Sequence, residues 1–137
     1  MTDAVSLLVS CTEYYAYLKN IAGNHVYVSL EKNGLVNTLL QTQVHFPSMD
    51  LDFYMGLLDG LLAMESDATE NAYAAYKART ELVIDVVNRI AKTHHMQAPE
   101  ACQMYYNSRV AEAVSEDSTN YYQKSADEIF ALVEQQA

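Results

Sequence analysis

The chain has 137 residues, half of them hydrophobic, which suffices for one compact domain with a buried core. Eighteen Asp and Glu against eight Lys and Arg give a formal net charge of −10, which disfavours binding to the phosphates of DNA or RNA. Since no basic stretch precedes an apolar run at the first residues, and no segment reaches about twenty uninterrupted apolar residues, we expect a cytoplasmic protein that is neither secreted nor membrane-spanning.

The first predicted helix is marked by apolar residues three and four positions apart, a spacing that places them on one helical face. They are Leu8, Cys11, Tyr15 and Leu18. Gly23 is expected to end this helix, because glycine adopts the left-handed backbone conformation at a helix C-terminus at little cost.

Three shorter helices are predicted to complete the first half. One runs from His25 to Asn33, with Asn24 as its N-cap and Gly34 as its stop. The next runs from Leu35 to about Gln41, and the last begins at Asp50, a residue type that caps helix N-termini well. The first half therefore forms a module of four helices.

A long helix is predicted to lead into the second half. Asp67 and Glu70 have the spacing of a capping box, and the segment from Thr69 to about His94 contains no Gly or Pro. We therefore expect a linker helix over residues 67–80 that continues into the second half.

The second half repeats the later elements of the first. Pro99 suits the first position of a short helix, and a third helix is expected from Val110 to about Glu116. The last helix should begin at Ser125, which together with Glu128 has capping-box spacing. No segment alternates apolar and polar residues long enough to require a strand.

Residues 75 positions apart (83 − 8 = 75) share one hydrophobic pattern, which indicates an internal repeat. The aligned apolar pairs include Leu8 and Val83, Cys11 and Val86, Tyr15 and Ile90, Leu30 and Tyr105, Leu39 and Val114, and Leu58 and Val133. The sequence thus predicts an all-α fold, a compact helical bundle over residues 1–137. It would consist of two tandem pseudo-repeated modules of about four helices each, 5–64 and 81–134, joined by the long helix.

Neither the cysteines nor the histidines form a pattern typical of catalysis or metal binding. Cys11 and Cys102 both fall within apolar helical patterns, and we interpret them as reduced core residues. His94 and His95 are adjacent and point about 100° apart on a helix, so a helix C-terminus explains them better than a shared metal. Since no Gly-rich phosphate-binding loop occurs either, we expect no cofactor and no metal.

Carboxylates on the fourth helix have two interpretations. Asp52 and Asp59 are seven residues apart and share a helix face, as a pair of acid–base residues would. Acids in a first turn also complement the helix macrodipole, and we favour this capping interpretation for Asp50 and Asp52.

The chain has eleven tyrosines and no tryptophan. Adjacent tyrosines occur at Tyr14-Tyr15, Tyr105-Tyr106 and Tyr121-Tyr122. Since neighbouring residues on a helix point in different directions, only one of each pair should be fully buried. The other is expected to be partly exposed, where tyrosine favours protein contacts. We therefore predict partner contacts at Tyr14, Tyr106, Tyr121 and Tyr122.

Short segments of the first half carry a resemblance to a known family. They are LVSCTEYY at 8–15, NHVY at 24–27, EKNGL at 31–35 and the region around His45. They resemble a small bacterial family of unknown function, numbered three-seven-nine-one among such families, and residues 81–133 resemble it more faintly. Only His45 matches the Leu-His-Thr loop of that family. Its genes often lie beside genes for ADP-ribosyltransferase-like toxin-type proteins, so the resemblance implies an antitoxin-like partner role.

Two functions follow as hypotheses. The first is a non-enzymatic protein-binding module, an antitoxin-like or regulatory partner of a toxin-type protein, with His45 and Asp52 joining the four tyrosines as contact residues. The second is a small helical ligand-binding domain or enzyme whose pocket lies between the two modules and is lined by His45, Asp52 and Asp127. A homo-oligomer is left open, whereas nucleic acid and membranes are not expected as partners.

Overall fold

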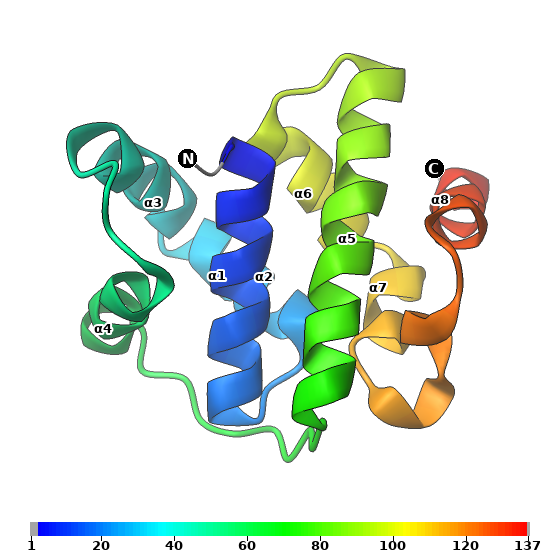
Figure 1. Cartoon of the computed structure of the whole chain (residues 1–137), viewed down its shortest axis with the longest axis horizontal. Helices are drawn as coiled ribbons and strands as arrows, with labels where there is room; N and C mark the ends of the chain where they lie inside the picture. Colours follow the sequence, from blue (N-terminus) through cyan, green and yellow to red (C-terminus); the bar gives the residue numbers. More distant parts are fainter. Residues whose placement is uncertain (1–2, 137) are drawn as a thin grey trace.

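Two long helices form the centre of the computed structural model, which describes residues 3–136. α1 (Ala4–Lys19) and α5 (Tyr73–His94) lie side by side and run antiparallel (Figure 1). α2 (Gly23–Lys32) packs against α1, and α6 (Ala98–Tyr106) packs against both central helices and against α2. Together these four helices enclose most of the core.

Four further helices flank the central pair. α3 (Leu35–His45) and α4 (Leu51–Leu61) both pack against α1, on the left in Figure 1. On the opposite side α8 (Ala126–Gln135) packs against α5, and α7 (Arg109–Val114) packs against α6 and α8. No strand occurs within residues 3–136, so the predicted all-α class is confirmed.

Some elements and buried residues of the two halves lie 75 positions apart. α2 and α6 begin 75 residues apart (98 − 23), and so do α4 and α8 (126 − 51). On the central helices, three aligned pairs are all buried: Leu8 and Val83, Cys11 and Val86, Tyr15 and Ile90. Equivalent burial at this offset is therefore observed for these six residues, and the duplication itself stays a prediction.

The first central helix ends at another residue than the sequence predicted, whereas the second ends at the histidine pair, as predicted. α1 ends at Asn20, whose φ of 56° is left-handed, and α5 ends in the same way at His95, whose φ is 55°. Asparagine adopts this conformation more readily than most residues, so no glycine is needed here. The predictions that Gly23 ends the first helix and that Asn24 caps the second are wrong, because Gly23 is already the first residue of α2.

The linker between the halves is only partly helical. α5 begins at Tyr73, and residues 62–72 form no helix. Asp67 and Glu70 do not make the predicted capping box, because the carboxylate of Asp67 accepts hydrogen bonds from the backbone N–H (3.1 Å) and hydroxyl (2.6 Å) of Thr69. The predicted linker helix over residues 67–80 is therefore wrong for its first half.

Asp67 also ties this linker to the start of α2. Its Oδ2 accepts the backbone N–H of Ala22 at 3.1 Å and lies 2.8 Å from Nδ1 of His25. Although burial raises the pKa of Asp67, the hydrogen bonds from Thr69, Ala22 and His25 outweigh it and lower the pKa from 3.8 to about 2. The contact joins residues more than 40 positions apart and could not be read from local spacing.

Other helix starts agree with the predictions. Asp50 caps α4, since its Oδ1 accepts the backbone N–H of Phe53 at 3.0 Å, and Ser125 forms the predicted capping box with Glu128 at the start of α8. α3 continues to His45, four residues beyond the predicted end. The Asp50 cap thus fixes the start of α4 at the end of the connection that follows α3.

Candidate functional site

Four large apolar side chains are exposed at the connection between α3 and α4. Val44 is 70% exposed, Phe46 54%, Met49 44% and Phe53 38%. All four lie within residues 44–53, and they are named here the α3–α4 corner. Scattered single exposed apolar residues are normal, but a local group of four of this size is typical of a contact surface.

Local geometry explains why these side chains face outward. The buried face of α3 consists of residues near its start, Leu35, Val36 and Leu39, so its last turn extends past the core. The cap by Asp50 then sets the rotation of α4, which turns Tyr54, Met55 and Leu58 inward. Phe53 precedes this buried face and is left partly in solvent.

A small cavity lies beside the corner, between α1 and the start of α4. Its volume is about 250 Å³, and it is lined by Leu7, Ser10, Met49, Asp50, Leu51 and Tyr54. Its walls are mostly apolar, whereas Asp50 contributes a carboxylate at the start of α4. The cavity has the size for one or two inserted side chains rather than a large ligand.

The segment of chain that contains the corner has acidic residues and no Lys or Arg. Between Asn33 and Tyr76 the sequence contains no Lys or Arg. The six acids in this stretch are Asp50, Asp52, Asp59, Glu65, Asp67 and Glu70. Asp59 pairs with Lys19 at 2.8 Å, but within residues 3–136 neither Asp50 nor Asp52 has an ion-pair partner. The corner therefore presents apolar groups together with two unneutralised carboxylates.

The second half lacks an equivalent apolar surface. The residues 75 positions after Val44, Phe46, Met49 and Phe53 are Thr119, Tyr121, Lys124 and Glu128. Three of these are polar or charged, and Tyr121 is half-buried. If the fold itself required apolar residues at these positions, both halves would carry them. The exposed apolar group is thus a property of the first half alone.

A buried arginine covers the corresponding connection in the second half. Arg79 on α5 donates from Nε to the carbonyl of Val114 at 2.7 Å and forms an ion pair with Asp117 in η1 (Asp117–Thr119). Its guanidinium also lies over the ring of Tyr122 in η2 (Tyr121–Gln123), 5.4 Å from the centroid. The first half has Ala4 at the position of Arg79. Among residues 3–136, no buried ion pair of this kind is formed by the α3–α4 connection.

The six residues predicted to contact a partner fall in different places. His45, at the end of α3, and Asp52, in the first turn of α4, are exposed next to the corner. Tyr14 is half-buried and stacks on Tyr76 with ring centroids 5.7 Å apart. Tyr121 and Tyr122 are half-buried on the far side of the molecule. These positions do not form one site.

Tyr106 is not a surface residue. It is only 2% exposed, and its neighbour Tyr105 is also buried, so the prediction that one tyrosine of each pair is exposed is wrong for this pair. The ring of Tyr106 stacks on Tyr27 at 4.9 Å, and its hydroxyl donates to Oε2 of Glu13 at 2.6 Å. Helices on both sides of α6 accommodate the two rings.

Glu13 is a buried carboxyl that does not form an accessible site. Burial raises its pKa, against the lowering effects of the Tyr106 hydrogen bond and the charge of Arg79. Gly23 leaves room for it, since a Cβ at that position would lie 2.6 Å from Oε2 of Glu13. The contacts join α1, α2 and α6 inside the core, so we assign Glu13 a structural role.

The alternative pocket between the halves does not have the predicted lining. His45 and Asp52 lie on the α3–α4 side, whereas Asp127 starts α8 on the opposite side and pairs with Arg89 (Figure 1). The prediction that these three line one pocket is wrong. A different cavity of about 300 Å³ does lie between the halves, lined in part by Tyr27, Glu31 and Leu40 and by Pro99, Glu100 and Gln103.

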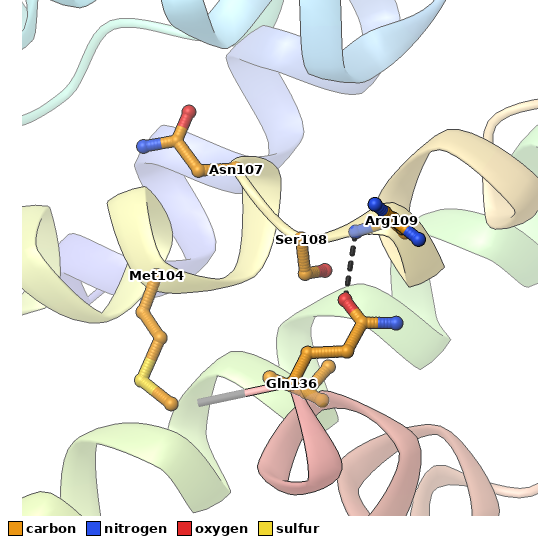
Figure 2. Close-up of a pocket in the computed structure, with 6 residues that line it drawn as sticks. Met104, Asn107, Ser108, Arg109 and Gln136 are labelled. Atoms are coloured by element: carbon orange, nitrogen blue, oxygen red, sulfur yellow. Dashed lines mark hydrogen bonds between the residues drawn. The ribbon is translucent and has the colours of Figure 1, made fainter.

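A larger hollow of about 610 Å³ lies where α6, α7 and α8 meet (Figure 2). Figure 2 shows Gln136 reaching across it to accept the backbone N–H of Arg109, at 2.8 Å. Met104, Asn107, Ser108 and Val133 complete its lining. Arg109 is the one ionisable side chain among these six residues, so the hollow offers no acid–base pair.

The cysteines and the histidine pair have structural surroundings. Cys11 and Cys102 are buried and not bonded to each other, as predicted, and burial raises the pKa of both thiols to about 12. His94 lies 2.6 Å from Oε1 of Glu134, and His95 ends α5. Within residues 3–136 no three His, Cys, Asp or Glu side chains are grouped closely enough to hold a metal, and no helix has the length and apolar content to span a membrane.

The residues of the corner were not predicted from the sequence. The signal was present, because Val44, Phe46 and Met49 surround Pro47 in a stretch without Lys or Arg and belong to no amphipathic stripe. Which apolar residues stay exposed depends on how far α3 extends past α1.

Comparison of the chain with protein-family models, with curated proteins and with solved structures finds no match. The resemblance of the first half to family three-seven-nine-one therefore stays a prediction. The fold and the α3–α4 corner are the observations on which a function can be based.

Proposed function

We propose that this chain is a non-enzymatic protein-binding module whose contact surface is the α3–α4 corner. The observation that carries the proposal is the exposure of Val44, Phe46, Met49 and Phe53 within ten residues, from the end of α3 to the start of α4. Fully burying an apolar side chain of this size contributes about 1.5–3 kcal/mol. A partner that covers the corner would therefore gain much of the free energy that specific association needs.

The composition of the corner supports a contact role. Aromatic residues and methionine are enriched in protein interfaces, and central anchors dominate their binding energy. Phe46, Met49 and Phe53 are of these types, and the adjacent cavity beside Leu7 and Tyr54 can accept a side chain of the partner. His45 and Asp52, predicted from the sequence, would lie at the polar rim of the same contact.

The specific form of this function that we propose is an antitoxin-like or regulatory partner of a toxin-type protein. Its support is the resemblance of residues 8–15, 24–27 and 31–35 to the bacterial family, together with the contact surface. Tyr14, Tyr121 and Tyr122 are placed away from the corner and are not needed for this contact.

The test compares proteins retained from host extract by the tagged full chain and by two double variants. Phe46→Ser/Phe53→Ser removes the aromatic anchors of the corner. Leu18→Ser/Val28→Ser removes two exposed apolar residues elsewhere and is the matched control. We expect a stoichiometric partner that is retained by the wild type and the control and is lost with the corner variant. Equal retention by all three chains would contradict the proposal, provided that their unfolding midpoints agree.

A second candidate function is a small-ligand domain, and one observation favours it. The cavity of about 300 Å³ between the halves combines Tyr27 and Leu40 with the carboxyl of Glu31, whose pKa is raised by burial. A ligand that fills it would stabilise the folded chain and raise the thermal unfolding midpoint, by an amount that grows with the logarithm of its concentration over its dissociation constant. Screening a metabolite library by thermal shift, with Leu40→Ser as control, distinguishes this function from protein binding.

A further inference from the structure

We infer that the partner segment seated on the α3–α4 corner is a basic amphipathic helix, with apolar side chains on one face and Lys or Arg beside them. The inference rests on the proposed function and adds the chemistry of the partner. It is based on the charge of the surface, on the cavity next to it and on the contrast with the second half.

Charge complementarity indicates that the partner segment carries positive charge. Residues 44–53 contain no Lys or Arg, and Lys19, which reaches α4 from α1, is paired with Asp59. Asp50 and Asp52 flank the exposed apolar groups, and Asp50 uses only Oδ1 to cap α4, which leaves its Oδ2 without a hydrogen bond in the part of the chain described. Lys and Arg donate well to such oxygens. An approaching cation therefore finds two carboxylates whose charge is not compensated.

The cavity determines where the apolar side chain of the partner goes. It opens between α1 and the start of α4, with Leu7 and Tyr54 as walls and Asp50 at its edge. A leucine or phenylalanine in this cavity would contact Met49, one of the four exposed apolar residues, and residues three or four positions away on its helix would extend the contact from there. Apolar side chains and Lys or Arg within one or two turns of one helix can thus contact the apolar residues and the carboxylates of the corner.

Two other occupants fit the surface less well. A second copy of this chain carries the same net charge of −10 and the same acids at its own corner, so self-association there would bring like charges together. An extended peptide gains its affinity by adding to the edge of a sheet, and residues 3–136 contain no strand. Of these occupants, a helix that binds the corner through its side chains fits the surface best.

The contrast between the halves predicts one site per chain. At the place corresponding to Met49 the second half has Lys124, whose Nζ lies 5.2 Å from the ring centroid of Tyr121. Arg79 lies under the same connection and is paired with Asp117. Both cations are paired with carboxylates, Lys124 with Glu128 and Arg79 with Asp117, and this place has no exposed group of large apolar side chains. Binding of the helix to the full chain should therefore have a stoichiometry of one to one.

The experiment uses a fluorescent amphipathic helical peptide of about 18 residues composed of Leu and Lys, titrated with the full chain and followed by anisotropy. We expect saturable one-to-one binding that weakens as salt rises from about 0.1 M to about 0.5 M, because screening shortens the range of the charges. Phe46→Ser/Phe53→Ser should weaken binding tenfold or more. A peptide with Glu in place of Lys, and a shuffled peptide without an apolar stripe, should not bind.

Charge variants separate a specific site from general attraction to an acidic protein. Asp50→Asn/Asp52→Asn removes two charges from the corner and keeps the helix cap, because asparagine caps as well as aspartate. Glu81→Gln/Glu112→Gln removes two exposed charges from the second half and is the matched control. We expect the corner variant to bind several-fold more weakly than the control and to show a smaller salt dependence.

Each outcome decides between the inference and the proposed function. Equal weakening by the two charge variants, or no effect of the Phe46 and Phe53 changes, would overturn the basic helix at this corner. If a host partner depends on the corner while the Lys peptide fails to bind, the protein-binding function stands and the basic partner is wrong. If the peptide binds at the corner and no host protein depends on it, the surface chemistry stands and the proposed function fails.

Discussion

Gly23→Ala adds one carbon at the position where the core is most closely packed against a polar group. The new Cβ would lie 2.6 Å from Oε2 and 3.1 Å from Cδ of Glu13, closer than Cβ atoms in proteins ordinarily approach other atoms. Glu13 is buried, and its Oε2 already accepts the hydroxyl of Tyr106 at 2.6 Å. The carboxyl can move away only by weakening that hydrogen bond.

Two effects of opposite sign decide the magnitude. Alanine is favoured over glycine in a helix by about 0.5–1 kcal/mol, and less at a first position. Overpacking a buried site costs about 1–3 kcal/mol, and leaving a buried polar group without its partner costs a further amount of about 1–3 kcal/mol. Since the carboxyl relaxes in part, we expect Gly23→Ala to lower the free energy of unfolding by about 1–3 kcal/mol.

Urea unfolding followed by circular dichroism measures this change. Gly56→Ala on α4 is the matched control, because nothing lies within 4 Å of its added Cβ, and it should raise stability by about 0.5–1 kcal/mol. In a Glu13→Ala background the carboxyl is absent, so Gly23→Ala should no longer destabilise. A Gly23→Ala chain as stable as the wild type, or an undiminished cost without the carboxyl, would refute the packing argument.

Three other predictions concern the linker, the thiols and the two halves. Because the pKa of Asp67 is lower in the folded chain than its ordinary 3.8, its stabilising effect is complete above pH 3.8 and is lost as pH falls through about 2. The difference in unfolding free energy between wild type and Asp67→Asn should therefore shrink over that window, and a constant difference would contradict it. Cys11 and Cys102 should react with a thiol reagent only on unfolding, since both are buried with raised pKa values, and rapid reaction of the folded chain would disprove this. Leu8→Ala and Val83→Ala should each cost about 2–5 kcal/mol in urea unfolding, and a negligible cost for either would argue against a core shared by both halves.

Local signals in the sequence predicted much of the helical framework. Asp50 and Ser125 begin α4 and α8 as expected, because a cap depends on side chains within three residues of one another. The histidine pair marks the end of α5 for a similar local reason. The end of α1 shows the limit of such local signals. Both Asn20 and Gly23 tolerate the left-handed conformation, so only the packing of α2 decides which of them ends the helix.

Contacts between distant residues account for what the sequence did not reveal. Asp67 was expected to cap a helix and instead binds the start of α2, and Tyr106 was expected on the surface and instead donates to Glu13, 93 positions away. The exposure of Phe46 likewise depends on where α3 passes α1. None of these follows from periodicity, because each is fixed by the arrangement of helices in space.

Arg79 has a consequence for local opening of the two halves. In the second half its bonds to Val114 and Asp117 must break before the connection between α7 and α8 can separate from α5. In the first half the matching residue is Ala4, so residues 44–53 can detach without losing a buried ion pair. Backbone amides near the C-terminal end of α3 should therefore exchange with solvent deuterium faster than those at the end of α7. The surface that we expect to receive a partner can therefore adjust to it at lower cost than the matching connection of the second half.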